Sequence, residues 1–554
     1  MRALAALYAE LDASTSIRVK SAALQRYFRS VPAADAAWGL YFLAGGRPRR
    51  LLPAAVLRGA ALAVSGLPAW LFEECYHSVG DLAETIALLL DEPQAGDPGA
   101  LADWMSDELL PLRGLAPAEQ AERVAALWRR LDAPGRFVLN KLITGGFRVG
   151  VSRQLVLRAL AAAFGREEHA LAQRVIGYTA ADARPDARAF HDLIGEASAD
   201  GAAHPPSAAQ PYPFFLAQPF QQDPISLGSV ADWLVEWKWD GIRAQLVCRH
   251  RTVSLWSRGE ELITDRFPEI RAAAEPLSGP LVFDGELLCW LPEASAPMPF
   301  AVLQTRIGRR TLSARRLREA PARFVAYDLL EDGSGDLRAL PLHERRERLQ
   351  AVSAKWGAGA LGLSERLESP DWPSLQALRA ESRARGVEGL MLKRATSAYG
   401  VGRTRSHPRG DWWKWKIDPW SVDAVLVYAQ AGHGRRASLY TDYTFAVWDG
   451  PPGSDRRLVP FAKAYSGLSD DEIRTFDGVI RRTTIEKFGP VRSVTPSLVF
   501  EIGFEGIARS PRHKSGVAVR FARILRPRPD KRIDDADQLA TLLALIDGPP
   551  AAPG

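Results

Sequence analysis

The sequence predicts a multidomain protein with a helical part, an α+β part and a β-barrel. At 554 residues the chain is too long for a single hydrophobic core. Its residue pattern changes twice, from helical to mixed at a Pro-rich stretch before residue 213, and to alternating strands after Pro419. We expect folded segments at 1–200, 213–418 and 419–545, a linker at 201–212 and a disordered tail at 546–554.

Composition limits the kinds of partner and compartment. Hydrophobic residues make up 47% and charged residues 25%, as in ordinary globular chains. The net charge of +6 suits a polyanionic partner if the basic residues cluster. Cys75, Cys248 and Cys289 lie far apart, which favours a reducing compartment and argues against a zinc site. Without a signal-like N-terminus or a long apolar run, we expect a cytoplasmic monomer with no membrane partner.

The helical prediction for residues 1–200 comes from apolar residues that recur at i, i+3 and i+4, as in Leu82, Ile86 and Leu89. Ser152 stands where an N-cap would begin a helix. Around it, residues 141–153 combine glycines, which let a backbone approach phosphates, with basic side chains. The alternative for this cluster is a helix hairpin with solvated basic ends.

The two later segments are predicted from short β-like runs. Between 213 and 418, runs such as 281–283, 287–290 and 324–327 alternate with helical patches, which is typical of an α+β domain. After Pro419, we predict strands at 422–429, 438–448, 458–464, 497–503 and 516–523. Ser469 and Glu472 form a capping box for one helix ending at Gly489. Five strands and one helix predict an OB-type barrel.

The segment from Glu236 to Arg243, near the middle of the chain, contains Lys238, Asp240 and Gly241. Apolar runs on both sides predict a bend between two short strands, for which glycine is suited. A lysine becomes a nucleophile when burial and neighbouring cations lower its pKa from about 10.4 toward neutrality. Taken alone, however, Lys238 is better explained as a surface lysine paired with Asp240.

Five further fragments turn this lysine into a candidate site. They are 257–259, 284–286, 324–328, 388–389 and 412–416. Lys414 and Lys416 share one strand face because side chains alternate with period two. Together the fragments offer cations for phosphates, two carboxylates for a divalent cation and an aromatic for a base. Taken alone, Phe324 is better explained as a core residue and Glu286 as a surface carboxylate.

The segment 238–243 matches K-x-D-G-x-R, the signature of the covalent nucleotidyltransferases, which include ATP-dependent DNA ligases, RNA ligases and capping enzymes. The other fragments resemble this family's remaining motifs in order, and 520–531 resembles its last motif, which ends in R-x-D-K. Glu236 matches the ligase position that favours ATP over GTP, and 145–152 resembles the DNA-binding domain of bacterial, archaeal and eukaryotic ligases. The resemblance implies an all-α DNA-binding domain, an α+β, ATP-grasp-like adenylyltransferase domain and a C-terminal OB-fold.

The resemblance also implies a role for each matched residue. Lys238 attacks the α-phosphorus of ATP and carries AMP as a lysyl-adenylate. Phe324 stacks on adenine. Nucleotide contacts are implied for Glu236, Arg243, Arg258, Glu286, Phe324, Arg409, Lys414 and Lys416. Glu286 and Glu388 match metal ligands, Arg526, Asp530 and Lys531 match pyrophosphate-orienting residues, and Lys141, Arg148 and Arg153 are DNA contacts.

The function implied is an ATP-dependent DNA ligase that seals 5′-phosphate/3′-hydroxyl nicks in duplex DNA, with ATP as co-substrate and Mg²⁺ or Mn²⁺ as metal. We expect a role in DNA repair, with any end-processing nuclease or helicase on a separate chain. Two alternatives stay open: an RNA ligase or capping-type transferase, and a non-catalytic scaffold that binds nicks.

Overall fold

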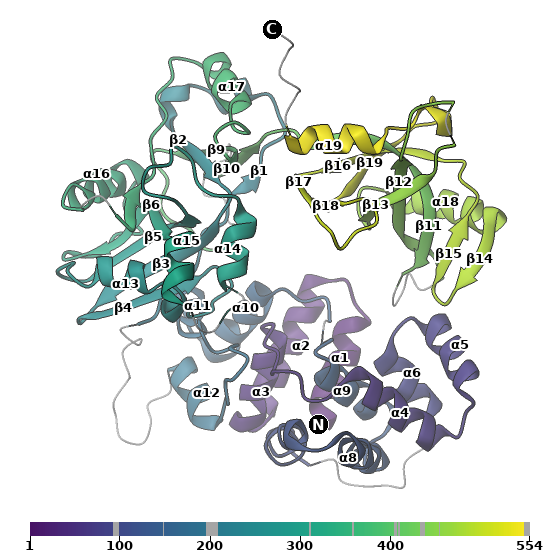
Figure 1. The fold of residues 1–554 in the computed structure, drawn as a ribbon. Helices are drawn as coiled ribbons and strands as arrows, with labels where there is room; N and C mark the ends of the chain where they lie inside the picture. The colour runs from purple at the N-terminus through teal and green to yellow at the C-terminus, as the bar shows by residue number, and fades with distance from the viewer. Residues whose placement is uncertain are drawn as a thin grey trace. The chain divides into compact units, whose positions relative to one another are not determined.

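A computed structural model of the chain describes residues 1–91, 99–147, 149–195, 209–307, 309, 312–356, 359–403, 407, 410–432, 438–453 and 455–547. Figure 1 shows helices in the first part of the chain, and sheets with helices in the remainder. The chain divides into two compact units. The first contains residues 1–51, 97–115 and 141–417, and the second contains residues 52–96, 116–140 and 418–554.

The helical prediction for the N-terminal part is confirmed in the described residues. Helices of the first unit are α1 (Arg2–Asp12), α2 (Ile17–Ser30), α3 (Ala33–Leu43), α7 (Leu101–Asp103), the π-helix η1 (Trp104–Leu109), η2 (Pro111–Gly114), α10 (Arg153–Phe164), α11 (Glu168–Arg174) and α12 (Ala187–Ile194). Helices of the second unit are α4 (Ala54–Ser65), α5 (Ala69–Val79), α6 (Leu82–Leu89) and α8 (Pro117–Arg129), and α9 spans Ala133–Thr144. Within the units, α2 packs against α1 and α10, and α4 packs against α8.

The predicted N-cap is present. The Ser152 hydroxyl accepts a hydrogen bond from the Leu155 backbone N–H at 3.1 Å, which satisfies one of the free donors at the start of α10.

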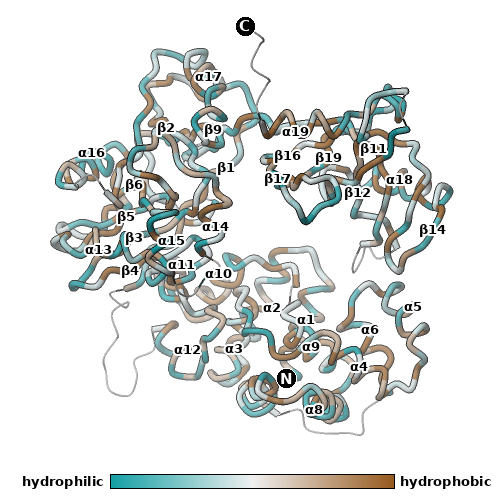
Figure 2. Tube along the Cα trace, viewed as in Figure 1, coloured by the Kyte–Doolittle hydropathy of each residue, from teal (hydrophilic) through white to brown (hydrophobic). Residues whose placement is uncertain are grey.

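A six-stranded sheet forms one layer of the central part. Its order is β4-β3-β5-β6-β7, with β8 beside β6. The strands are β3 (Ile242–Arg249), β4 (Thr252–Ser257), β5 (Leu281–Cys289), β6 (Ala322–Asp332), β7 (Gly335–Asp336) and β8 (Leu361–Leu363). One face packs on α13 (Pro268–Ala274), α14 (Phe300–Ile307) and α16 (Leu342–Ser353). A further short helix, α15, spans Ala314–Glu319. Figure 2 shows α16 as largely hydrophilic, so it covers the core with few apolar side chains, Leu342 and Leu349 among them.

A second sheet of four strands forms the other layer. Its order is β1 (Gln218–Pro219), β10 (Trp412–Lys416), β9 (Val387–Arg394) and β2 (Trp233–Trp239). One face packs against α17 (Trp372–Ala380). A smaller apolar cluster joins the layers, because Trp412 of β10 packs with Val247, Val282 and Leu330 of the larger sheet. The short helices η3 (Pro224–Leu227), η4 (Val230–Asp232) and η5 (Thr264–Arg266) complete this part.

The C-terminal part is a strongly bent antiparallel sheet around β11 (Trp420–Ala431). Its strands are β12 (Tyr440–Trp448), β13 (Leu458–Ala464), β14 (Thr484–Phe488), β15 (Val491–Val494), β16 (Val499–Phe504) and β19 (Arg523–Pro527), with a separate pair β17 (Gly506–Arg509) and β18 (Val517–Arg520). Strand β11 pairs with β16 along its first half and with β15 near its end. The same strand therefore passes from one group of strands to the other.

Two predictions for this part need correction. The helix α18 (Asp470–Thr483) has the predicted Ser469–Glu472 capping box, but it ends at Thr483 and β14 follows. Thr484, Ile485 and Phe488 favour a strand over a further helical turn. The predicted tail overlaps a helix, α19 (Leu539–Asp547), whose apolar residues pack against the core of this part (Figure 2). Residues 548–554 lie outside the described part of the chain.

No single helix in the described ranges is long and apolar enough to cross a membrane, although the bent pair α4 and α5 passes that test together by length and composition alone.

Candidate active site

Lys238 lies where the chain passes from one central sheet to the other. It is near the end of β2, and Asp240 and Gly241 connect β2 to β3. The predicted bend is present, but its two strands belong to different sheets. Gly241 is needed for space, because a Cβ atom there would lie 2.3 Å from the Leu287 carbonyl oxygen. A larger residue would push β2 and the nucleophile candidate away from β5.

Glu388 of β9 holds Lys238 in place. Its carboxylate accepts a hydrogen bond from Lys238 Nζ, and Lys416 Nζ of β10 lies 3.4 Å from the same oxygen. Burial alone would raise the pKa of Glu388, but the charges of Lys238 and Lys416 outweigh it and hold that pKa below its ordinary value. Gly389 allows this approach of β9 to β10, since its φ is +133° and a Cβ atom would lie 2.3 Å from the Trp415 carbonyl oxygen.

Lys414 adds a second cation to the same face of β10. It pairs with Met391 and Lys416 pairs with Gly389, so both lysines lie on one side of the strand, as predicted. Trp413 and Trp415 take the opposite side and pack in the apolar cluster against α17. Partial burial, with the charges of Lys238, Lys416, Arg403 and Arg258, lowers the pKa of Lys414. The site therefore concentrates positive charge.

Glu286 faces this charge from the other sheet. It lies on β5, opposite Arg243 of the neighbouring strand β3. Burial raises the pKa of Glu286 to about 8, although the charges of Lys238 and Arg243 oppose the rise. No described residue donates a hydrogen bond to its carboxylate. Within the described ranges, no group of three or more His, Cys, Asp and Glu side chains could hold a metal ion. The two carboxylates Glu286 and Glu388 instead fit Mg²⁺, which is commonly held by one or two carboxylates together with substrate phosphates.

We predict that the buried carboxyl of Glu286 lowers the free energy of unfolding as the pH rises. In the unfolded chain this carboxyl has an ordinary value near 4.5, and in the folded chain its pKa is about 8. The unfolded state therefore binds fewer protons between these values, and stability decreases as pH rises from about 4.5 to about 8. Urea unfolding of metal-free protein at pH 5 and pH 8 should show a smaller decrease for Glu286→Gln than for wild type. Glu275→Gln, at an exposed carboxylate on the same layer, should follow wild type. Equal decreases in wild type and Glu286→Gln would contradict the prediction.

Arg243 is mostly occupied by protein partners. Its guanidinium donates to both Asp284 carboxylate oxygens at 3.1 and 2.6 Å, to the Phe215 carbonyl oxygen at 2.6 Å and to the Tyr399 hydroxyl at 3.3 Å. Four of its five N–H donors are thus used, which leaves one without a partner among the described residues. The predicted nucleotide contact of Arg243 is limited to that donor. Its main task in the fold is to join β3, β5 and the segments around residues 215 and 399.

Glu236 is buried beneath the site, with an exposed fraction of 1%. Its carboxylate accepts a hydrogen bond from Arg346 Nη1 of α16 at 2.8 Å and from Lys393 Nζ of β9 at 2.5 Å. Lys393 Nζ in turn lies 4.0 Å from the centre of the Tyr327 ring. Two cations therefore fix the rotamer of Glu236, and a contact with a base would use the remaining lone pairs of its carboxylate.

The prediction that Phe324 stacks on the base is wrong. Phe324 is fully buried in the core that packs on α13, α14 and α16. Glu286 pairs with Val325, the next residue of β6, so the site lies on the opposite face of the sheet. Val325 and Tyr327 share that face, and Tyr327 donates a hydrogen bond to Asp284 at 3.3 Å. An aromatic residue is suited to stack on a base, but the alternation of side chains along β6 puts Phe324 on the face away from the site.

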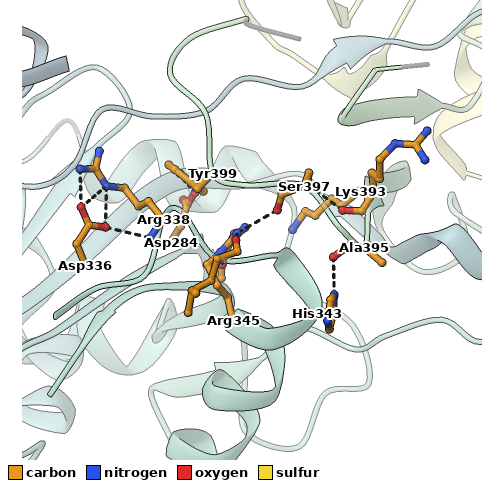
Figure 3. A network of polar contacts seen from close by, with 12 residues as sticks. Asp284, Asp336, Arg338, His343, Arg345, Lys393, Ala395, Ser397 and Tyr399 are labelled. Atoms are coloured by element: carbon orange, nitrogen blue, oxygen red, sulfur yellow. Dashed lines mark hydrogen bonds and ion pairs between the residues drawn. The ribbon is translucent and has the colours of Figure 1, made fainter. Parts of the chain in front are cut away.

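The segment that follows β9 is anchored by a polar network (Figure 3). The Ser397 carbonyl oxygen accepts from Arg345 at 3.1 Å, and the Ala395 carbonyl oxygen accepts from the His343 backbone N–H at 2.9 Å. Tyr399 donates to Asp284 at 2.6 Å. Sequence reasoning missed these residues. Asp284 was within a quoted motif, but nothing in the pattern around Tyr399 indicated a partner 115 positions away.

The remaining predicted contacts lie on other elements. Arg258 is exposed after β4, and its backbone N–H donates to the Arg243 carbonyl oxygen at 2.9 Å. Lys141 is half-buried on α9. Arg153 pairs with Glu260 and donates to the Val175 carbonyl oxygen at 3.3 Å, so part of its charge is already balanced. Arg148 and Arg409 lie outside the described residues.

The pyrophosphate-orienting candidates form ion pairs within the C-terminal part of the second unit. Arg526 donates to Glu501 at 2.6 Å, and Lys531 donates to Asp423 at 2.5 Å. Asp530 accepts two hydrogen bonds from Arg528, which hold its pKa at about 2.

Comparison with known proteins agrees with the motifs. Residues 1–161 match the model described as DNA ligase N terminus, 214–416 match ATP dependent DNA ligase domain, and 436–531 match ATP dependent DNA ligase C terminal region. The second of these matches contains Lys238 and the other quoted fragments of the central part.

Three bacterial relatives are described as probable DNA ligases. A probable DNA ligase of Koribacter versatilis is 32% identical over 97% of this chain and 95% of its own length. A probable DNA ligase of Anaeromyxobacter sp. is 31% identical over 90% and 92% of the two chains. One of Opitutus terrae is 31% identical over 94% of this chain, which spans 60% of that relative.

A solved structure described as Pmar-Lig_PreS3 shares the fold. It covers 95% of this chain and 99% of its own length, with a TM-score of 0.62 and 15% identity. With the relatives above, the chain belongs to the ATP-dependent DNA ligase family.

Proposed function

We propose that this DNA ligase works through a lysyl-adenylate on Lys238 and seals nicks between a 5′-phosphate and a 3′-hydroxyl in duplex DNA. The observation that carries the proposal is the contact of Lys238 with Glu388, beside Lys414 and Lys416. A nucleophile, a proton acceptor and two phosphate-binding cations thus lie on neighbouring strands of one sheet.

In the first step, Lys238 Nζ forms a bond to the α-phosphorus of ATP as the bond to the pyrophosphate oxygen breaks. Lys238 must lose a proton, and Glu388 accepts its hydrogen bond. Lys414 and Lys416 stabilise the negative charge that grows on the phosphate oxygens. Glu286 and Glu388 would hold Mg²⁺ or Mn²⁺, which neutralises phosphate charge when bound.

In the later steps, the adenylyl group passes from Lys238 to the 5′-phosphate of a nick. The adjacent 3′-hydroxyl attacks that phosphate, and AMP leaves. We further propose three functional parts: a helical DNA-binding part, the two-sheet adenylyltransferase part and a C-terminal OB-type barrel. The barrel assignment is supported by β11, which pairs with two groups of strands.

Nick sealing tests this proposal directly. Full-length protein is incubated with Mg²⁺, ATP or GTP, and duplexes that carry a single nick in a DNA strand or an RNA strand. We expect sealing of the DNA nick with ATP. Labelling of the protein by GTP or preferential sealing of the RNA nick would favour an RNA ligase or capping-type enzyme. Binding to the nicked duplex without sealing would favour a scaffold.

Salt dependence provides a further check on the DNA contacts. If the basic residues of the helical part bind phosphates, affinity for nicked DNA falls steeply as the salt concentration rises. Titrations from about 50 to about 200 mM salt should show that the logarithm of the affinity decreases linearly with the logarithm of the salt concentration. A flat response would exclude phosphate contacts as the main source of affinity.

A further inference from the structure

Asp423 is a buried carboxylate at the centre of the C-terminal ion pairs. It lies on β11 with an exposed fraction of 7%. Arg528 Nη1 donates to both of its oxygens at 3.0 Å, and Lys531 Nζ donates to one of them at 2.5 Å. Asp423 thus joins two cations of the last motif, although it lies outside the motif itself.

The backbone around Asp423 is fixed from the other side. Its N–H donates to the Asp537 carboxylate at 2.8 Å, and the Asp537 N–H donates to the Asp423 carbonyl oxygen at 2.8 Å. In the sheet, Asp423 lies opposite Glu501 of β16, and Glu501 lies opposite Arg526 of β19. The backbone of Asp423 is therefore fixed, which restricts where its carboxylate and the two cations bound to it can lie.

The segment after β19 is held by short-range bonds, among them those from Arg528 Nε and Nη2 to the Asp530 carboxylate at 2.9 and 2.7 Å. The Arg528 N–H donates to the Val499 carbonyl oxygen at 2.9 Å, and the Lys531 N–H donates to the Arg528 carbonyl oxygen at 3.1 Å. Beyond these bonds, the chain turns without regular structure until the short helix η7 (Ile533–Asp535). Lys531 keeps 32% of its side chain exposed, so it can reach a ligand while one side is tethered.

We propose that Asp423 is a positioning residue for adenylation, which aligns Arg528 and Lys531 so that both present their charge to the leaving pyrophosphate. A long cation loses much rotamer freedom when it binds a phosphate, and a tether present beforehand removes part of that cost. The inference rests on the proposed function. In this inference Arg528 and Lys531 contact the pyrophosphate, and Asp423 positions both of them.

The test separates the first chemical step from the last. Full-length wild type, Asp423→Asn and Asp423→Ala are assayed for adenylation with α-labelled ATP and for sealing of a nick that already carries 5′-AMP. We expect a decrease in the adenylation rate of about tenfold or more for both variants, with pre-adenylated nicks sealed at nearly the wild-type rate. One tenfold step corresponds to about 1.4 kcal/mol of lost alignment.

A matched variant controls for lost ion pairing in the barrel. Asp477 is 8% exposed and accepts from Arg481 at 2.6 Å on α18, away from the last motif. Asp477→Asn should leave the ratio of the two rates as in wild type. Pyrophosphate-driven release of AMP from the adenylated protein should be slowed by the Asp423 variants and unaffected in the control, because it is the same step in reverse.

The outcomes are distinguishable. If wild type forms no adenylate, the proposed function fails. If wild type forms it and Asp423→Asn matches the wild-type rate, the inference is overturned. It is also overturned if both variants slow the two steps equally, which would assign Asp423 to stability alone. Thermal unfolding of each variant identifies loss of folded protein.

Discussion

Replacing Lys238 by arginine or alanine should reduce formation of the protein-bound adenylate to a trace. Lys238 donates its hydrogen bond to Glu388 from β2, beside the two lysines of β10. Arginine keeps the charge but not the nucleophile, since its guanidinium stays protonated. We expect a decrease of roughly 10⁴- to 10⁶-fold, the range typical of removing a nucleophile. Labelled ATP and separation on a denaturing gel measure it.

Two comparisons make this result specific. Lys355→Arg, at an exposed lysine after α16, should be labelled like wild type. Lys238→Arg should still seal nicks that are already adenylated, because that step needs no transfer through the lysine. Label that persists on Lys238→Ala would move the nucleophile to another residue.

Replacing Asp284 by alanine should destabilise the two-sheet part by about 3–5 kcal/mol. Asp284 is fully buried and accepts hydrogen bonds from Arg243, Tyr399 and Tyr327. Its removal leaves the Arg243 charge buried without a carboxylate, which costs more than the pair itself contributes. Urea unfolding of the full chain, followed by tryptophan fluorescence, measures the change because Trp412 lies beside Arg243.

The controls separate this network from ordinary surface pairing. Glu319→Gln removes the partner of Arg315, which is 83% exposed, and should leave the urea midpoint close to that of wild type because exposed ion pairs stabilise little. The double change Arg243→Leu with Asp284→Leu removes both charges and should recover part of the loss. If Asp284→Ala and Glu319→Gln unfold at the same urea concentration, the network does not stabilise the fold.

The site was predictable where local patterns decide the geometry. Alternation along β10 correctly put Lys414 and Lys416 on one face, and the apolar runs around Lys238 predicted its bend. The resemblance assigned Lys238 and Glu388 to one site but did not predict their contact, and 150 positions separate them. Long-range pairing of strands, which a single sequence does not encode locally, brought them together.

The failures have equally local causes. Phe324 and Val325 are adjacent apolar residues on a strand buried on both faces, so no polar alternation tells which one faces the site. The partners of Glu236 come from α16 and β9, and each would pass for an ordinary charged residue. The described residues after Pro419 contain nine strands where five were predicted, since β14, β15, β17 and β19 have only four or five residues each.

The two-sheet arrangement divides the chemistry between two layers that an apolar cluster around Trp412 joins. Lys238, Glu388, Lys414 and Lys416 all belong to the four-stranded sheet, whereas Glu286 belongs to the larger one. A change in the spacing of the layers would leave the attacking nitrogen aligned with its cations. It would alter the distance from Glu286 to Lys238 and Glu388. A divalent cation held by both carboxylates would therefore be sensitive to the spacing of the layers, whereas the contacts of Lys238 within its own sheet would not.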